Sequence, residues 1–179
     1  MKICVTGGIA SGKSLLSRYL NELGVETIDA DDVVHSLIPA DERRRLAKAV
    51  FSDSKARKEL EARIHPFVKE RISGFLSSPP SPAQGSDSLR LAIIPLLFEV
   101  HWEPEFDIIC SVVSSREHQL ERMMTTRGMS REEAEARIAA QMPAEEKAAK
   151  SHYVIRNDGT AAELKAQAET FVRWLKQKV

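Results

Sequence analysis

The segment GGIASGKS at residues 7–14 decides how this chain folds. It matches the pattern G-x-x-x-x-G-K-[ST] in full, with an apolar run before it and the amphipathic helical sequence LLSRYLNEL after it. Glycines let the backbone curl so that successive N–H groups point into one concavity, and the following helix adds the positive end of its dipole. The segment therefore predicts a phosphate-binding loop between a buried strand and a helix.

Two side chains of the loop are suited to a nucleoside triphosphate: Lys13 would neutralise the outer phosphates, and the Ser14 hydroxyl is placed to bind Mg²⁺. A GTPase would also need D-x-x-G and N-K-x-D segments, and the string NDG at 157–159 is not such a guanine-binding segment. The apolar run 89–97 leads into PLLFE instead of an aspartate, so the usual second metal ligand is missing there. This pattern favours the small-molecule kinases, in which substrate groups and waters complete the metal shell.

Short apolar or β-branched runs alternate with stretches of helical periodicity along the chain. They lie at 2–6, 25–28, 89–97, 107–114 and 153–155. This alternation predicts an α/β fold of three layers, with a five-stranded parallel sheet covered on both faces. Pro95 must fall near the end of its strand, because proline cannot donate a hydrogen bond to the sheet.

The intervening stretches carry helix signals. Thr160 with Glu163, and Ser130 with Glu133, form the pattern of a capping box. The stretch 53–77 has apolar residues at helical spacing, and Pro66 within it predicts two helices or a kink. The Pro/Ser/Gly-rich stretch 77–88 is expected to be a mobile surface loop.

Composition narrows the class of partner. The 179 residues suit one domain, 1–179, and contain 26 Lys and Arg against 26 Asp and Glu, so the formal net charge is zero. This balance argues against a nucleic-acid partner, and any charge requirement must be local to a site. Cys4 and Cys110 lie in apolar runs and are expected to be buried rather than paired. The start of the chain has no signal or membrane-spanning pattern, so no membrane partner and a cytoplasmic location are expected.

The string IDADDVVH at 28–35 follows the second predicted strand, and so its aspartates belong at the ligand-binding edge of a parallel sheet. Asp31 is a candidate base that accepts the proton of an acceptor hydroxyl during phosphate transfer. Alternatively, Asp29, Asp31 and Asp32 cap the helix that begins here, and we expect one of them to do so.

Arginines crowd the segment HQLERMMTTRGMSREEAEARIAAQ, which predicts a helical hairpin with a turn at Gly128. Such a hairpin would form a lid whose guanidinium groups stabilise the transferring phosphoryl group and exclude water. The alternative is a set of solvated arginines paired with nearby glutamates at helical spacing. The arginines are Arg122, Arg127, Arg131 and Arg137, and the glutamates are Glu121, Glu132 and Glu133.

Taken in order, several strings resemble the dephospho-CoA kinase family: TGGIASGKS, IDADDVVH, LEARIHPFV, PLLFE, QLERMMTTRGMSREEAEARIAAQMPAEEK and HYVIRNDGT. The resemblance implies a phosphate-loop kinase with a helical acceptor-binding subdomain at about 33–76 and a lid at about 116–142. It also implies transfer of the γ-phosphate of ATP to the 3′-hydroxyl of dephospho-CoA, the final step of coenzyme A biosynthesis. The partners would be these two small molecules, with Mg²⁺ accompanying ATP.

The same resemblance assigns residues to roles. The catalytic residues would be Lys13, Asp31 as the base, and Arg137. ATP would be bound by Gly7, Gly8, Ala10, Ser11, Gly12, Lys13, Ser14, Leu15, Arg127 and Asn157, with Ser14 also binding the metal. The acceptor would be bound by His35, Arg43, His65, Phe98 and Glu99. His65 has an alternative role in satisfying carbonyls beside Pro66, and Phe98 an alternative place in the core.

The chain departs from the family pattern in two places. Only residues 36–41 join His35 to ERRRLAKAVFSD, so the acceptor subdomain is shortened, and Glu42 replaces an aspartate. Ser151 and His152 stand where the family tends to have Ala-Asp. The shortening leaves two alternatives: a kinase for another small hydroxyl or nucleotide acceptor, and a nucleotide-binding module without catalysis. A monomer is favoured, although the sequence does not determine the oligomeric state.

Overall fold

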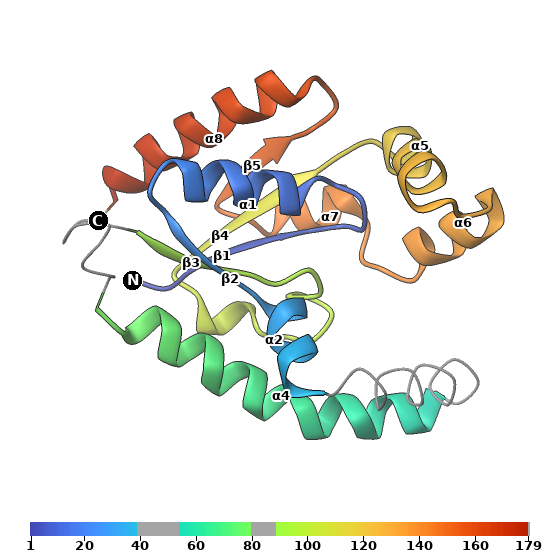
Figure 1. Ribbon diagram of the computed structural model, residues 1–179, viewed down its shortest axis with the longest axis horizontal. Helices are drawn as coiled ribbons and strands as arrows, with labels where there is room; N and C mark the ends of the chain where they lie inside the picture. Colours follow the sequence, from blue (N-terminus) through green and yellow to red (C-terminus); the bar gives the residue numbers. More distant parts are fainter. Residues whose placement is uncertain (39–53, 80–88, 179) are drawn as a thin grey trace. The chain divides into compact units, whose positions relative to one another are not determined.

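The computed structural model describes residues 1–38, 54–79 and 89–178, with side chains described outside 54–61 (Figure 1). Its contacts divide into two compact units. The larger unit comprises Met1–Thr27 and Pro80–Val179, and the smaller unit comprises Ile28–Pro79. Arg43, a predicted acceptor-binding residue, lies outside the described residues, as do residues 80–88 of the loop expected at 77–88.

Five strands form one parallel sheet in the order β2-β3-β1-β4-β5, which confirms the predicted fold class. They are β1 (Ile3–Gly7), β2 (Glu26–Asp29), β3 (Arg90–Ile93), β4 (Ile108–Val113) and β5 (Tyr153–Arg156). Only β3 is much shorter than its predicted run of 89–97. The Ile94 N–H still donates to the Val5 carbonyl, but Pro95 follows and has no N–H to continue the ladder.

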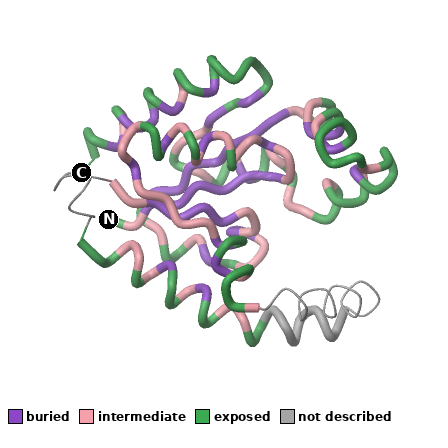
Figure 2. Tube along the Cα trace, in the orientation of Figure 1, coloured by how far each residue is buried: buried purple, intermediate pink, exposed green. Residues whose placement is uncertain are grey.

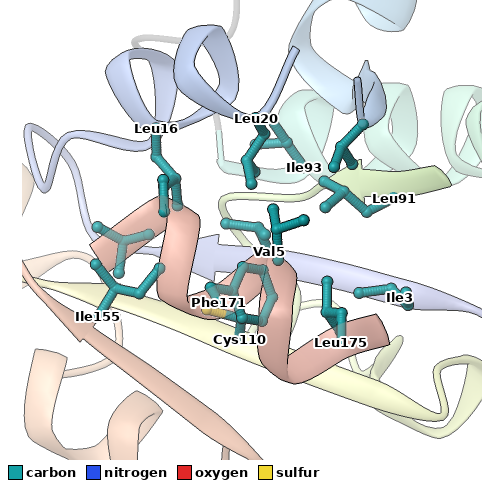
Figure 3. Close-up of a cluster of buried hydrophobic side chains, with 14 of the residues drawn as sticks. Ile3, Val5, Leu16, Leu20, Leu91, Ile93, Cys110, Ile155, Phe171 and Leu175 are labelled. Carbon is teal, nitrogen blue, oxygen red and sulfur yellow. The ribbon is translucent and has the colours of Figure 1, made fainter. Parts of the chain in front are cut away.

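Alternation along the strands divides the larger unit into layers. Val5 of β1 and Cys110 of β4 face α1 (Lys13–Glu22) and α8 (Ala161–Lys176), where Phe171 is fully buried (Figure 3). On the opposite face, the Ser111 hydroxyl donates to the Lys147 carbonyl of α7 (Ala144–Ala149) at 3.2 Å. The sheet therefore lies between two helical layers. Figure 2 shows buried backbone along β1, β3 and β4, whereas β2 is of intermediate burial.

The predicted hairpin consists of α5 (Arg116–Arg127) and α6 (Arg131–Ala139), which lie beyond the carboxyl ends of β1 and β4 (Figure 1). Gly128 ends α5 with a φ of 62°, and the Ser130 hydroxyl accepts from the Glu133 N–H at the start of α6. At the start of α8, Thr160 and Glu163 form both hydrogen bonds of the predicted capping box. The helix signals in the sequence therefore identified real helix ends.

The smaller unit contains α2 (Ala30–Leu37) and α4 (Ser54–Ser77), which contact each other. Of the two alternatives predicted at Pro66, two separate helices is wrong, because α4 continues through the proline. A proline removes one backbone hydrogen bond, whereas this helix has many others on both sides. Between β3 and β4 lies a short 3-10 helix, η2 (Glu103–Glu105). Among the described helices, none is both long and apolar enough to cross a bilayer.

Candidate active site

The phosphate loop connects β1 to α1, and two of its glycines are required by close approaches. Gly7 has a φ of 152° and Gly12 a φ of 102°, both in the region that favours glycine. A Cβ at Gly7 would overlap the Val112 carbonyl, and one at Gly12 would overlap the Asn157 amide. The loop is therefore packed against the ends of β4 and β5, which places its backbone at the carboxyl edge of the sheet.

Lys13 and Ser14 begin α1 directly after this loop. The Lys13 ammonium donates to the carbonyl oxygens of Gly7 at 2.9 Å and Gly8 at 2.8 Å, so the charge is held beside the loop backbone. Ser14 is exposed. Both side chains line a cavity of about 680 Å³.

This cavity is strongly basic. Its lining contains Lys13, Arg18, Arg122 and Arg127, and none of the described residues that line it carries a carboxylate. Clustered charge of one sign in a cleft concentrates ligands of the opposite sign. A chain of zero net charge thus has a local site suited to a polyphosphate, as the sequence required.

Arg122 has a different place from the other arginines of the hairpin. Its Nη1 donates to the Ala10 carbonyl and to the Ser114 hydroxyl, both at 3.2 Å, and its Nη2 donates to the Asn157 carbonyl at 2.7 Å. These bonds use the planar, multidentate geometry of a guanidinium. Arg122 thereby connects the phosphate loop to the ends of β4 and β5.

The remaining hairpin arginines differ in their surroundings. Arg127 is exposed and lines the cavity. Arg131 pairs with Glu135 on the same helix at 3.1 Å, which is the solvated pairing expected at helical spacing, though with a different glutamate. Arg137 is exposed in the last turn of α6 and forms no hydrogen bond or ion pair with the described residues.

Asn157 follows β5 and is buried. Its side-chain amide donates to the Ser11 carbonyl at 2.8 Å, and its own N–H donates to the Val113 carbonyl at 2.9 Å. Asn157 also lines the cavity. Asn157, one of the predicted ATP-binding residues, therefore holds the phosphate loop against β5.

Asp158 connects the same segment to the hairpin. Its Oδ1 accepts from the Ser115 N–H at 2.7 Å and from the Ser114 hydroxyl at 2.8 Å, and it lies 3.2 Å from His118 Nδ1. The Ser115 N–H, followed by these side chains, lowers the pKa of Asp158 below its usual value. A stabilised carboxylate thus holds the segment after β5 to the start of α5.

The smaller unit contains three of the predicted site residues that the structure describes. Asp29 Oδ1 accepts from the Asp31 N–H at 2.8 Å, so Asp29 is the helix cap among the three aspartates. The Asp31 side chain is exposed in the first turn of α2, and His35 is exposed in the last turn. His65 is half-buried on α4. The expectation that one aspartate caps the helix is confirmed.

Glu99 and Phe98, two predicted acceptor residues, lie in the larger unit. Glu99 Oε1 is 2.8 Å from the ammonium of Lys147, whose side chain is fully buried, and Glu99 also accepts from the Met142 N–H at 3.0 Å. The Lys147 ammonium donates further to the Pro95 carbonyl at 2.9 Å. Phe98 is 2% exposed, as expected for a core residue. The acceptor roles of both remain predictions.

Sequence reasoning missed Arg18, Lys147, Gln119 and Gln141. Arg18 lies four residues after Ser14 on the same helix, and this spacing could have identified it. The two glutamines bind the phosphate loop across 110 and 132 residues, and no local pattern signals such a contact.

A phosphate loop on a five-stranded parallel sheet, a basic cavity beside it and an arginine-bearing hairpin define a phosphate-loop kinase. Comparisons with known proteins agree. The family model for dephospho-CoA kinase (CoaE) matches residues 1–43 and 40–163. The chain belongs to the dephospho-CoA kinase family, whose known role is the final step of coenzyme A biosynthesis.

Relatives and solved structures that resemble this chain span nearly all of it. A dephospho-CoA kinase of Geobacter sulfurreducens is 37% identical over 197 residues, covering 98% of this chain and 98% of the relative. A solved structure from Thermus thermophilus has a TM-score of 0.79 at 33% identity, covering 98% of this chain and 97% of that one. The dephospho-CoA kinase of Campylobacter jejuni shares the fold, with a TM-score of 0.72 at 24% identity over 99% of both chains. The chain is therefore an ATP-dependent phosphotransferase.

Proposed function

We propose that this protein transfers the γ-phosphate of ATP to the ribose 3′-hydroxyl of dephospho-CoA. The observation that carries the proposal is the basic cavity of about 680 Å³ beside the phosphate loop. ATP would place its phosphates against the loop amides and Lys13, with its base toward Asn157. Arg127 would approach the phosphates from the hairpin.

Mg²⁺ would accompany ATP. The described residues include no group of three or more His, Cys, Asp or Glu side chains able to hold a metal ion. The Ser14 hydroxyl lies in the cavity lining, and Mg²⁺ prefers a few protein oxygens together with phosphate oxygens and waters. The residues present therefore fit a metal that binds with its nucleotide, and the ion would supply neutralisation of phosphate charge.

Asp31 would orient the acceptor hydroxyl and accept its proton, while Lys13 and Arg137 stabilise charge on the transferring group. Support for Asp31 comes from its exposed carboxylate, since Asp29 already caps the helix. We place the acceptor subdomain at about 33–76 and the lid at about 116–142. The acceptor would contact His35, Arg43, His65, Phe98 and Glu99.

The proposal includes the setting in which the enzyme acts. ATP and dephospho-CoA are its small-molecule partners, and it requires neither nucleic acid nor a membrane. It acts in the cytoplasm as a monomer.

One assay tests the function: ADP release by the purified protein with Mg²⁺ and ATP, with and without dephospho-CoA. We expect acceptor-dependent ADP release and a product heavier by one phosphate. Lys13→Ala should weaken nucleotide binding and turnover together. AMP and shikimate serve as competing acceptors, and preferential turnover of either would replace the proposed acceptor. Nucleotide binding without transfer to any acceptor would indicate a non-catalytic module.

A further inference from the structure

The backbone of Ile9, at the tip of the phosphate loop, is held by two glutamines, one at its N–H and one at its carbonyl. Gln119 of α5 donates from Nε2 to the Ile9 carbonyl at 2.6 Å. Gln141, which follows α6, accepts the Ile9 N–H with Oε1 at 2.7 Å. Gln119 is 5% exposed, so its hydrogen bond is shielded from water. Two segments of the hairpin region therefore hold the two peptide groups on either side of one loop residue.

The two glutamines act with opposite polarity. A backbone N–H can only donate and a carbonyl can only accept, so Gln141 must present its oxygen and Gln119 its nitrogen. The orientation of each amide is thus set by the backbone itself. The two residues are not interchangeable in chemistry, although they are identical in composition.

Ala10, which follows Ile9, shows why the tip of the loop needs support. Ala10 has a φ of 55°, a left-handed conformation that costs a residue with a Cβ about 1 kcal/mol. Arg122 donates to the Ala10 carbonyl at 3.2 Å. A Cβ at Gly8 would lie 2.8 Å from Gln119 Nε2, so the glycine there makes room for this glutamine. The side chains of the hairpin and the shape of the loop are therefore fitted to each other.

We propose that Gln119 and Gln141 are positioning residues for phosphate binding. They hold the Ile9 N–H and carbonyl so that the loop keeps its concave shape before the nucleotide arrives, which lowers the ordering cost of binding. Neither residue needs to touch the nucleotide. This inference rests on the proposed function only in taking the bound anion to be the nucleotide phosphates.

Replacing each glutamine by glutamate tests the inference, because both variants add the same charge beside the backbone of the same residue. Gln141→Glu retains an oxygen that accepts the Ile9 N–H. Gln119→Glu loses the donor and faces a carboxylate toward the Ile9 carbonyl. We expect Gln119→Glu to raise the Kd for ADP about tenfold more than Gln141→Glu does, because only Gln119→Glu loses its hydrogen bond to Ile9. Titration calorimetry with ADP and Mg²⁺ measures both values.

A second pair of variants separates positioning from general destabilisation. Gln141→Ala should weaken ADP binding about tenfold, and adding Ala10→Gly should recover part of the loss because glycine adopts the left-handed conformation without a Cβ penalty. Gln167 provides a matched control. It donates to the Arg156 carbonyl at 2.8 Å and accepts the Arg156 N–H at 3.1 Å, so it holds the backbone of β5 in the same way without a hydrogen bond to the phosphate loop. Gln167→Ala should leave the Kd for ADP unchanged.

Equal Kd values for the two glutamate variants would overturn the inference, as would an absence of rescue by Ala10→Gly. If Gln119→Glu does not fold, Gln119→Met gives the same test, since it also lacks the donor. ADP titration needs no acceptor. Failure of the wild-type protein to phosphorylate dephospho-CoA would therefore overturn the proposed function, whereas the inference about the two glutamines is decided by the Kd values for ADP alone.

Discussion

Lys147 is the most deeply buried charge that the structure describes, and its surroundings account for that burial. Its ammonium pairs with Glu99 at 2.8 Å and donates to the Pro95 carbonyl at 2.9 Å. Removing one partner of such a pair leaves an uncompensated charge. Lys147→Met should therefore reduce the free energy of unfolding by about 3 kcal/mol. Urea denaturation would measure the change.

Lys150 offers a matched control on an exposed position just after α7. Lys150→Met should change the free energy of unfolding by less than about 0.5 kcal/mol. The double variant Lys147→Met with Glu99→Gln should recover part of the loss, because the half-buried Glu99 carboxylate is then no longer left without its counter-charge. A loss for Lys147→Met no larger than for Lys150→Met would show that the pair contributes little.

A second prediction for a single residue concerns Asp31. Its N–H is used in capping by Asp29, whereas its own carboxylate is exposed and available for proton transfer. Asp31→Asn should lower kcat on the order of 100-fold, since an amide cannot accept the proton. The Kd for ATP should be retained. Steady-state kinetics and ATP titration check the two parts, and a wild-type kcat would exclude Asp31 as the base.

At the scale of elements, Asp158 connects the segment between β5 and α8 to the start of α5 through hydrogen bonds. Its pKa is lowered, chiefly by the Ser115 N–H, so folding favours its charged form. The stabilisation is present above the unfolded pKa of about 3.9 and is lost as pH falls through the lower folded value. The side chain is 41% exposed, so solvent screening limits the effect to less than about 1 kcal/mol.

Asp158→Asn should accordingly lower stability slightly at pH 7 and flatten its decline below about pH 4. Thermal unfolding across pH 3–7 measures the difference from wild type. Glu169→Gln, on the exposed face of α8, serves as the control. If the stability of Asp158→Asn falls below pH 4 as steeply as that of wild type, the charge of Asp158 does not support this connection.

Local signals predicted the elements well where the deciding interactions are local. Apolar runs between helical stretches identified all five strands, and Thr160 with Glu163 marked the start of α8. Both signals depend on residues that are neighbours in the chain. The division at Pro66 was not predicted uniquely, because one missing hydrogen bond does not end a long helix. β3 was predicted too long because the apolar run continues past Ile93, although Pro95 has no N–H to continue the ladder and Leu97 is buried outside the strands.

His152 stands where the family tends to have an aspartate, and its role can be understood only from the folded structure. The His152 N–H donates to the Ile109 carbonyl at 2.9 Å, and the Ile109 N–H donates to His152 Nδ1 at 3.0 Å. A ring nitrogen here provides the acceptor that a carboxylate would provide, so the change is compatible with the sheet. The sequence identifies the substitution, but the acceptor role depends on a residue 43 positions away.

For the whole molecule, the division into two compact units predicts separable responses to the two substrates. The basic cavity lies entirely within the larger unit, and the proposed acceptor subdomain lies within Ile28–Pro79. ADP with Mg²⁺ should therefore slow amide hydrogen exchange in the phosphate loop and α5. Dephospho-CoA should slow exchange in α2 and α4, because a ligand protects the elements that its binding stabilises.

Hydrogen-exchange mass spectrometry on the full chain would distinguish these patterns. Lys13→Ala should abolish the protection by ADP while leaving the protection of α2 and α4 by dephospho-CoA. Shikimate, as a control acceptor, should protect neither helix. Protection of the phosphate loop by dephospho-CoA alone, with α2 and α4 unaffected, would place the acceptor in the larger unit. The shortened segment after His35 would then matter less for the choice of acceptor than the residues around Glu99.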